Sequence, residues 1–270
     1  MSAPRPEIIT SLTNETVKLA RSLNDRKARR DSGLFLAAGR DMLERARAGR
    51  FKPHYIFIDE RASGESWTEM LLDWDAKARV SLVTEVVMGK LSGMSNPPPV
   101  AALLKQRPAA LPPTAGIQKD DTWLVLENIH DPGNLGTIIR TADAAGAKGI
   151  ILVGDCADPF SPEAVRASTG SIFAVPIATA SADQFIEWAK NWPGLILGSA
   201  ASGAADFRTA ADRHPVLLLI GSESNGLSAR LIGLCHRLAR IPMAGTTESL
   251  NAATATALLL YEVRRTFLGA

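Results

Sequence analysis

The chain has 270 residues and a mass of 28.8 kDa, and 46% of its residues are hydrophobic, which is enough to bury a core in one or two domains. Its first residues lack a basic stretch followed by an apolar one, and the longest aliphatic run, 216–220, is too short to span a bilayer, so we expect no membrane segment and a cytoplasmic location. Two cysteines, Cys156 and Cys235, are too few for a disulfide framework and lack the spacing of a metal site, so we expect a reducing compartment and no bound metal.

Basic residues are concentrated near the N-terminus. Residues 18–50 contain ten Lys or Arg against four Asp or Glu, although the net charge of the chain is only +2. A helix dense in charges is about as often simply exposed to solvent as it is a binding surface, but clustered cations can also pair with nucleic-acid phosphates. The candidates for such contacts are Lys18, Arg21, Arg26, Lys27, Arg29 and Arg30.

Residues 1–106 predict a small α/β domain. Thr13 can cap a helix that runs towards Arg30, and residues 65–79 suit a second helix. Strands are expected at 54–60, 80–83 and 99–105. Residues 107–121 are rich in proline and show no apolar periodicity, which indicates an extended linker and a domain boundary.

Residues 122–270 predict a second α/β domain, built on a parallel sheet that helices cover on both faces. Continuous aliphatic runs alternate here with helical patterns, as such sheets require. Strands are expected at 122–129, 149–154, 173–178, 194–200 and 215–221, and helices at 135–145, 162–168 and 182–192, with a last helix from Leu250. Ligands of these sheets sit beyond the carboxyl ends of the strands, and three polar, Gly-containing segments begin at such ends.

In the first segment, a helix follows a strand and ends near Gly146. The N-terminus of such a helix attracts anions; Asn134 can cap it, and Arg140, roughly two turns in, could reach a phosphate. Taken alone, the pattern could also be an ordinary cap with a surface arginine. The spacing of Gly133 and Gly136 differs from GxGxxG, which disfavours a nicotinamide enzyme without excluding it.

In the second segment, Gly221 and Gly226 allow the backbone to turn tightly and to approach a ligand. Glu223 lies between them, where it could orient an arginine or a ribose hydroxyl, or else cap the helix after Ser228. Ser224 does not have the GxSxG spacing of a nucleophile elbow, so a serine hydrolase is disfavoured.

In the third segment, a strand is expected to end at 241–243, and a loop leads to Ser249, Leu250 and Asn251 at the start of a helix that runs to Phe267. That helix is apolar nearly all round and should be buried in a core or a dimer interface. We therefore expect the loop, and not the helix, to carry the function of this segment.

Together, the segments NIHDPGNLGTIIRTADAAG, LLLIGSESNGL and IPMAGTTESLN resemble the motifs of the SpoU/TrmH family of RNA ribose 2′-O-methyltransferases, within the SPOUT superfamily. The resemblance implies S-adenosyl-L-methionine as methyl donor, ribosomal or transfer RNA as substrate, a homodimer, and a deep trefoil knot in the α/β fold. The segment FLAAGRDMLERARAGRFKPHYIFIDE resembles the substrate-binding domain that often precedes SpoU domains and shares its fold with RNA-binding ribosomal proteins. The family often has an acidic residue where this chain has Ala38.

The resemblance also assigns roles to single residues. It implies catalytic roles for Asn134, Arg140, Glu223, Ser249 and Asn251, and cofactor contacts for Gly221, Ile241 and Leu250. The family commonly continues Ser-Leu-Asn with a small apolar residue and a serine, whereas this chain has Ala252 and Ala253.

Our hypothesis for the chemistry rests on Arg140, which stays protonated and is therefore a poor base. We expect it to grip the phosphate of the target nucleotide and to stabilise negative charge that develops on the 2′ oxygen, with Ser249, Asn251 and Glu223 fixing the geometry. His130 could act as a base, but a histidine in a turn is more often only hydrogen-bonded. The alternative function is a non-catalytic RNA-binding or ribosome-assembly protein that retains the fold.

Overall fold

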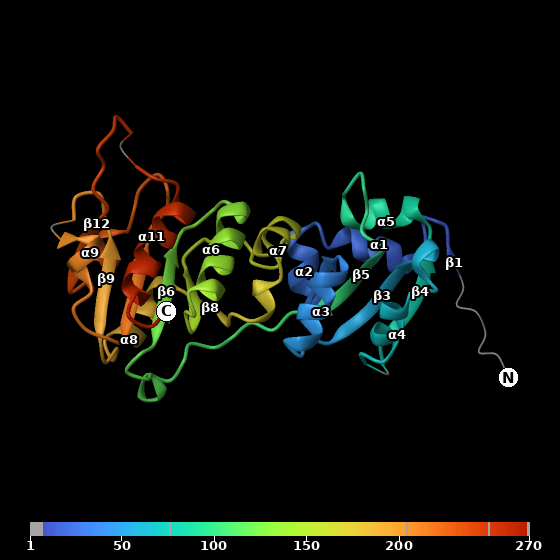
Figure 1. Cartoon of the computed structure of the whole chain (residues 1–270), viewed down its shortest axis with the longest axis horizontal. Coiled ribbons are helices and arrows are strands. Elements are labelled where there is room, and N and C mark those ends of the chain that lie inside the picture. Colours follow the sequence, from blue (N-terminus) through green and yellow to red (C-terminus); the bar gives the residue numbers. More distant parts are fainter. Residues whose placement is uncertain (1–7, 76, 204, 248, 269–270) are drawn as a thin grey trace. The chain divides into compact units, whose positions relative to one another are not determined.

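The computed structural model describes residues 8–75, 77–203, 205–247 and 249–268, which form two compact units (Figure 1). The first unit contains the described residues up to Arg107 together with Phe160–Phe173, and the second contains Pro108–Pro159 and those from Ala174 onwards. Among the described residues, none of the helices combines the length and the apolar character needed to cross a membrane.

The first unit is built on a five-stranded mixed sheet with the strand order β1-β4-β3-β5-β2, in which β5 runs antiparallel to both of its neighbours. Its strands are β1 (Ile8–Ile9), β2 (Leu34–Ala38), β3 (Pro53–Asp59), β4 (Arg79–Val83) and β5 (Val100–Lys105). Its helices are α1 (Glu15–Ser22), α2 (Arg26–Ser32), α3 (Arg40–Ala48), α4 (Ser66–Leu72), α5 (Glu85–Ser92) and α7 (Pro162–Ser168), with short 3-10 turns at Glu60–Ala62 and Ser171–Phe173. Buried residues of α1 and α5 form one core with the sheet.

The strands expected at 54–60, 80–83 and 99–105 are confirmed by β3, β4 and β5. The prediction of one helix from Thr13 to Arg30 is wrong. Asn14 caps α1 by accepting a hydrogen bond from the backbone of Thr16 at 2.9 Å, and Asp25 starts a separate α2 by capping it. The helix expected at 65–79 stops at Leu72, and the chain enters β4 at the far end of that range.

The segment Phe160–Phe173, which the sequence places in the second half of the chain, completes the core of the first unit. The rings of Phe160 and Phe35 lie 4.8 Å apart, and those of Phe173 and Phe51 lie 5.0 Å apart. Aromatic pairs at these distances contribute packing energy beyond the area they bury. The first unit is therefore discontinuous in sequence.

The second unit is a seven-stranded sheet with the order β10-β12-β9-β11-β6-β7-β8, in which every pair is parallel. Its strands are β6 (Thr122–Glu127), β7 (Gly149–Val153), β8 (Ile177–Ala180), β9 (Leu195–Ser199), β10 (Ala205–Asp206), β11 (Val216–Ile220) and β12 (Arg237–Arg240). Its helices are α6 (Pro132–Ala144), α8 (Ala182–Ala189), α9 (Phe207–Ala210), α10 (Ala229–Ile232) and α11 (Ala252–Arg264), with a 3-10 turn at Thr114–Gly116. The expected parallel α/β sheet is confirmed.

The two faces of this sheet are buried against different helices. Alternate residues of β6, Trp123 and Val125, share a core with Phe185 of α8, whereas α6 and α11 pack against each other (Figure 1). The proline-rich segment is held to this unit, because the indole N–H of Trp188 donates to the carbonyl of Pro112 at 2.7 Å.

Several element boundaries differ from those expected, among them that of the helix expected at 182–192, which ends at Ala189. The strand expected at 173–178 starts only at Ile177, because Pro176 has no N–H to donate to a sheet ladder. The strand of the third segment ends at Arg240, before the expected 241–243, and the last helix ends at Arg264 instead of Phe267.

Candidate active site

Three loops meet at the carboxyl edge of the parallel sheet, namely those that follow β6, β11 and β12. Asn134 comes after β6, Glu223 after β11 and Asn251 after β12, and their side chains are hydrogen-bonded to one another. The structure thus brings together one polar residue from each of the three sequence segments.

The position of Asn134 follows from the way α6 begins. Asp131, not Asn134, caps this helix: its carboxylate accepts a hydrogen bond from the backbone N–H of Asn134 at 2.5 Å, and Pro132 occupies the first turn. The prediction that Asn134 is the cap is therefore wrong. Because Asp131 takes that task, the side chain of Asn134 is free to reach the loop after β11.

The hydrogen bonds run from Asn251 through Asn134 to Glu223. Nδ2 of Asn251 donates to Oδ1 of Asn134 at 2.9 Å, and Nδ2 of Asn134 donates to Oε1 of Glu223 at 2.7 Å. Oδ1 of Asn251 accepts from the backbone N–H groups of Ala253 and Thr254 at 2.9 and 3.3 Å, as the cap of α11.

This arrangement fixes the direction of every donor. The oxygen of Asn251 faces the N–H groups at the start of α11, so its amide nitrogen must face Asn134. Asn134 then accepts with its oxygen and can only donate to Glu223, whose carboxylate is an acceptor when ionised. The chain of amides therefore holds the carboxylate of Glu223 through its Oε1 atom.

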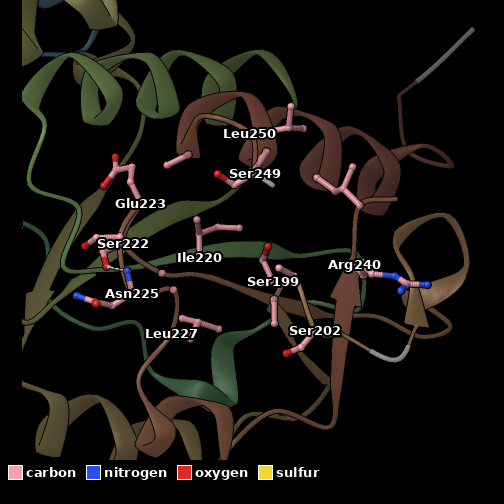
Figure 2. A pocket seen from close by; sticks show the side chains of 18 of the residues that line it. Ser199, Ser202, Ile220, Ser222, Glu223, Asn225, Leu227, Arg240, Ser249 and Leu250 are labelled. Carbon is pink, nitrogen blue, oxygen red and sulfur yellow. Dashed lines mark hydrogen bonds between the residues drawn. The ribbon is translucent and has the colours of Figure 1, made fainter. Parts of the chain in front are cut away.

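A cavity of about 810 Å³ opens beside this group of residues. Its apolar lining includes Ile220, Leu227, Ile241 and Leu250, and Glu223 and Ser249 add polar groups. Figure 2 shows Ser249 and Leu250 on one side of the hollow and Leu227 on the other. A cavity of this size with a few polar groups suits a small organic ligand.

Part of the cavity wall is bare backbone. Ser222 and Gly226 exchange two backbone hydrogen bonds of 3.2 and 2.9 Å, which close the loop on itself. A Cβ atom on Gly221 would lie 2.0 Å from the carbonyl carbon of Gly226, and Gly226 has a φ of +64°. Both glycines are thus required by the shape of the loop.

Arg140 does not line the cavity. It is exposed on α6 and has no hydrogen-bond or ion-pair partner in the part of the chain that the structure describes. It lies six residues after Asn134, which turns it by about 240° around the helix axis, so the two side chains leave α6 in different directions. His130 is exposed in the preceding turn and does not line the cavity either.

Neither cysteine is suited to nucleophilic chemistry. Burial raises the pKa of Cys235 to about 12, with a smaller contribution from the charge of Glu127, and burial also raises the pKa of Cys156. Within the described ranges, no three His, Cys, Asp or Glu side chains are grouped so as to hold a metal ion.

Two acidic residues near the site were missed in the sequence. Asp131 carried a recognisable signal, since an Asp directly before Pro is a common helix start. Glu127 is the last residue of β6, is buried, and accepts a hydrogen bond from the backbone N–H of Ser228 at 2.7 Å. Its only signal was an acidic residue at the end of an apolar strand.

The basic candidates of the first unit differ in exposure. Arg29 is only 3% exposed, and its guanidinium donates to the carbonyls of Leu23 and Asn24. It therefore ties α2 to the preceding turn and is not available to a phosphate. The other candidates are exposed, namely Lys18, Arg21, Arg26, Lys27 and Arg30.

Residues 121–261 match the SpoU rRNA Methylase family, and residues 14–102 match the MRM3-like substrate binding domain. The chain is 31% identical to the 23S rRNA (uridine(2479)-2′-O)-methyltransferase of Streptomyces viridochromogenes, over 97% of this chain and 93% of the relative. It is 27% identical to the 23S rRNA (guanosine(2553)-2′-O)-methyltransferase RlmP of Bacillus subtilis, over 95% and 98%.

Among solved structures, the chain is similar to an AdoMet-bound rRNA methyltransferase from Sinorhizobium meliloti. The sequence identity is 39%, the TM-score is 0.89, and the match covers 97% of this chain and 99% of that one. The likeness therefore extends over both units.

Proposed function

This chain belongs to the SpoU rRNA methylase family, and we propose that it methylates a ribose 2′-hydroxyl of ribosomal RNA. It is an RNA 2′-O-methyltransferase that uses S-adenosylmethionine. Ribosomal RNA is preferred over transfer RNA because full-length relatives named for their substrates act on 23S rRNA. The observation that carries the proposal is the hydrogen-bonded chain from Asn251 to Glu223 at the cavity.

The cavity suits S-adenosylmethionine on several grounds. Its volume of about 810 Å³ accommodates a ligand of that size, and the apolar side chains of Ile241 and Leu250 suit an adenine ring. The backbone at Gly221 forms a wall that a Cβ atom would disrupt. The ionised carboxylate of Glu223 complements a cationic sulfonium. We propose Gly221, Ile241 and Leu250 as the residues that hold the cofactor.

When bound, the cofactor supplies an electrophilic methyl group on sulfur. The residues of this chain have to align the ribose oxygen and help it to lose its proton, and alignment alone can lower the barrier by several kcal/mol. We assign orientation of the carboxylate to Asn134 and Asn251, and a hydrogen bond to the ribose to the hydroxyl of Ser249, a residue that lines the cavity.

Arg140 has a separate task in the proposed mechanism. Its guanidinium binds the phosphate of the target nucleotide and stabilises charge on the 2′ oxygen. Its exposure and its lack of a partner among the described residues leave all of its donors available.

We further propose a homodimer. Leu258 and Tyr261 are 42% and 45% exposed, three residues apart on α11, and so present an apolar face. α11 packs against α6, which carries Arg140. A second copy seated on this face would bring Arg140 of one copy towards the cavity of the other, which accounts for its absence from its own cavity.

The first unit is proposed to bind the RNA substrate, with a fold like that of RNA-binding ribosomal proteins. Support comes from its match to a substrate binding domain and from the exposed cations of α1 and α2, namely Lys18, Arg21, Arg26, Lys27 and Arg30. Such cations pair with phosphates regardless of sequence. Arg29 is left out because it is buried.

We also propose that the second unit contains the deep trefoil knot of the family, an exception to the rule that chains do not thread their own loops. Its strand order, in which β9 lies between β12 and β11, is compatible with such threading. A cytoplasmic location is proposed as well, because the relatives named above are rRNA methyltransferases of Streptomyces viridochromogenes and Bacillus subtilis.

The proposed function is tested by transfer of a labelled methyl group from S-adenosylmethionine to bacterial RNA that lacks the modification. Ribosomal and transfer RNA are assayed separately, and the products are digested to nucleosides. We expect label in a 2′-O-methyl nucleoside of ribosomal RNA and its loss in Arg140→Ala. Label on a base would overturn the ribose assignment, and label in transfer RNA alone would overturn the choice of substrate. Cofactor binding without any transfer would favour the non-catalytic alternative.

A further inference from the structure

A buried carboxylate lies beneath the loop that walls the cavity. Glu127 is 4% exposed at the end of β6, and its Oε2 accepts the backbone N–H of Ser228 at 2.7 Å. A carboxylate buried to this degree is costly unless it is hydrogen-bonded, so this contact is the feature that makes the position tolerable. Glu127 itself does not line the cavity.

The contact closes one end of the 221–228 loop. At the start of the loop, β11 pairs with β6, with Ile220 opposite Leu126, so Gly221 leaves the sheet at the level of Glu127. At the end of the loop, the side chain of Glu127 holds Ser228. Both ends of the loop are thus fixed to the same strand, one by the sheet ladder and the other by a single side chain.

The residues between these ends are the ones that form the cavity wall. Leu227, directly before Ser228, lines the cavity and is 6% exposed. Glu223, at the tip of the loop, is held by Asn134. Loss of the bond to Ser228 would remove one restraint on the part of the loop that carries Leu227, while the core packing of Leu227 and the contact between Glu223 and Asn134 would remain.

We propose that Glu127 is a positioning residue that keeps the 221–228 loop in the conformation that binds S-adenosylmethionine. It does so through the hydrogen bond to the Ser228 backbone and not through its charge. The inference rests on the proposed function in that the ligand of the cavity is taken to be this cofactor.

The test separates the hydrogen bond from the charge with three variants. Glu127→Leu removes both, Glu127→Gln keeps an acceptor oxygen without the charge, and Ser228→Ala keeps the backbone N–H while losing the hydroxyl that caps α10. Two quantities are measured: the Kd for S-adenosylmethionine by calorimetry, and amide hydrogen exchange across 221–228 in the cofactor-free protein.

We expect Glu127→Leu to raise the Kd about tenfold or more, and to speed exchange in this loop, because the part-buried N–H of Ser228 loses its partner. Glu127→Gln should stay within about threefold of the wild type, as should Ser228→Ala. An unchanged Kd and exchange rate in Glu127→Leu would overturn the proposal. So would a Glu127→Gln variant as weak as Glu127→Leu, since charge would then be the active property.

Should Glu127→Leu fail to fold, Ser228→Pro removes the donor and the hydroxyl, and its ring also restricts the backbone of Leu227; the φ of Ser228, −64°, already suits proline. Ser228→Pro must then bind S-adenosylmethionine more weakly than its control, Ser228→Ala, or the proposal fails. If the wild type does not bind S-adenosylmethionine, the proposed function fails, whereas exchange in the cofactor-free protein still decides whether Glu127 anchors the loop.

Discussion

At the scale of single residues, the site is defined by the direction of its hydrogen bonds. Asn251 is oriented by the start of α11, Asn134 is oriented by Asn251, and Glu223 is oriented by Asn134. Each amide uses both its oxygen and its nitrogen in this chain. A substitution that preserves shape but reverses a donor is therefore more informative than one that removes the side chain.

The first prediction concerns Asn134→Asp, which replaces the donor that faces Glu223 with a second carboxylate. We expect kcat to fall roughly 100-fold at neutral pH, because like charges repel at hydrogen-bond distance. The methyl-transfer assay on both proteins, at one neutral pH, checks this. Thr137→Ala, on an exposed position of the same helix, is the control.

The second prediction concerns Gly221→Ala. The added Cβ atom would meet the backbone of Gly226, so the loop must open and the cavity must change shape. We expect the Kd for S-adenosylmethionine to rise by about tenfold or more, since the new atom cannot be accommodated by a side-chain movement. Gly245→Ala in the third segment has open space around the new atom and should bind like the wild type. Equal affinities for the two variants would contradict the role given to Gly221.

A third residue-scale prediction separates the phosphate grip of Arg140 from simple positive charge. Arg140→Lys keeps the charge but loses the planar pair of donors that matches a phosphate. We expect its kcat to fall at least about tenfold while its Kd for S-adenosylmethionine stays unchanged, because Arg140 does not line the cavity of its own chain. Full activity in the methyl-transfer assay would exclude a bidentate contact.

At the scale of elements, periodicity in the sequence predicted the buried strands well and the helix ends poorly. The apolar runs that became β6, β7 and β11 were recognisable because a strand covered on both faces has no polar side. Helix starts depend on which of two neighbouring polar residues turns back to the backbone. Asn14 caps α1 in place of Thr13, and Asp131 caps α6 in place of Asn134.

The candidate site, too, was predicted only in part from the sequence. The three segments were identified because Gly and polar residues interrupt apolar strands at their carboxyl ends. The hydrogen bond from Asn134 to Glu223 joins residues far apart in the chain, and no local pattern reports which side chains meet. Glu127 was overlooked for a related reason, since its partner is a backbone group at Ser228.

An element-scale prediction concerns the end of β3. Hydrogen bonds from Arg61 to the buried Asp59 lower the pKa of Asp59 below its usual value, although burial acts against this. A carboxyl whose pKa is lower in the folded state stabilises the protein above its unfolded pKa, and this stabilisation is lost as the pH falls through the folded pKa.

Unfolding of the first unit by urea should therefore become easier below about pH 4. Asp59→Asn should cost roughly 1–3 kcal/mol at pH 7 and should flatten the pH dependence in the acid range. Arg61→Gln removes the partner and should likewise flatten the pH dependence in the acid range. An unchanged acid slope in both variants would refute this account of the ion pair.

At the scale of the whole molecule, the two units are not consecutive pieces of sequence. The chain leaves the first unit at Arg107 and returns to it for Phe160–Phe173 before completing the second. Sequence reasoning placed this segment with the catalytic half because its helix follows a strand of the parallel sheet in regular order. The assignment depends on which aromatic rings meet in space, and that information is absent from local periodicity.

The last prediction tests this assignment in the full chain. Phe160 and Phe173 are buried against Phe35 and Phe51, and truncation of a buried aromatic side chain costs about 3–5 kcal/mol. In Phe160→Ala and Phe173→Ala we expect faster hydrogen exchange in β2 and α3 of the first unit and an unchanged Kd for S-adenosylmethionine.

Phe185→Ala, on α8 in the core of the second unit, is the matched control and should give the opposite pattern, with exchange raised around β6 and β8 and weaker cofactor binding. The two patterns can be distinguished because buried contacts protect the elements they touch before they affect the rest of the chain. If Phe160→Ala instead loosened the sheet of the second unit and left β2 protected, the segment would have to be counted with the methyltransferase fold, as its position in the sequence suggests.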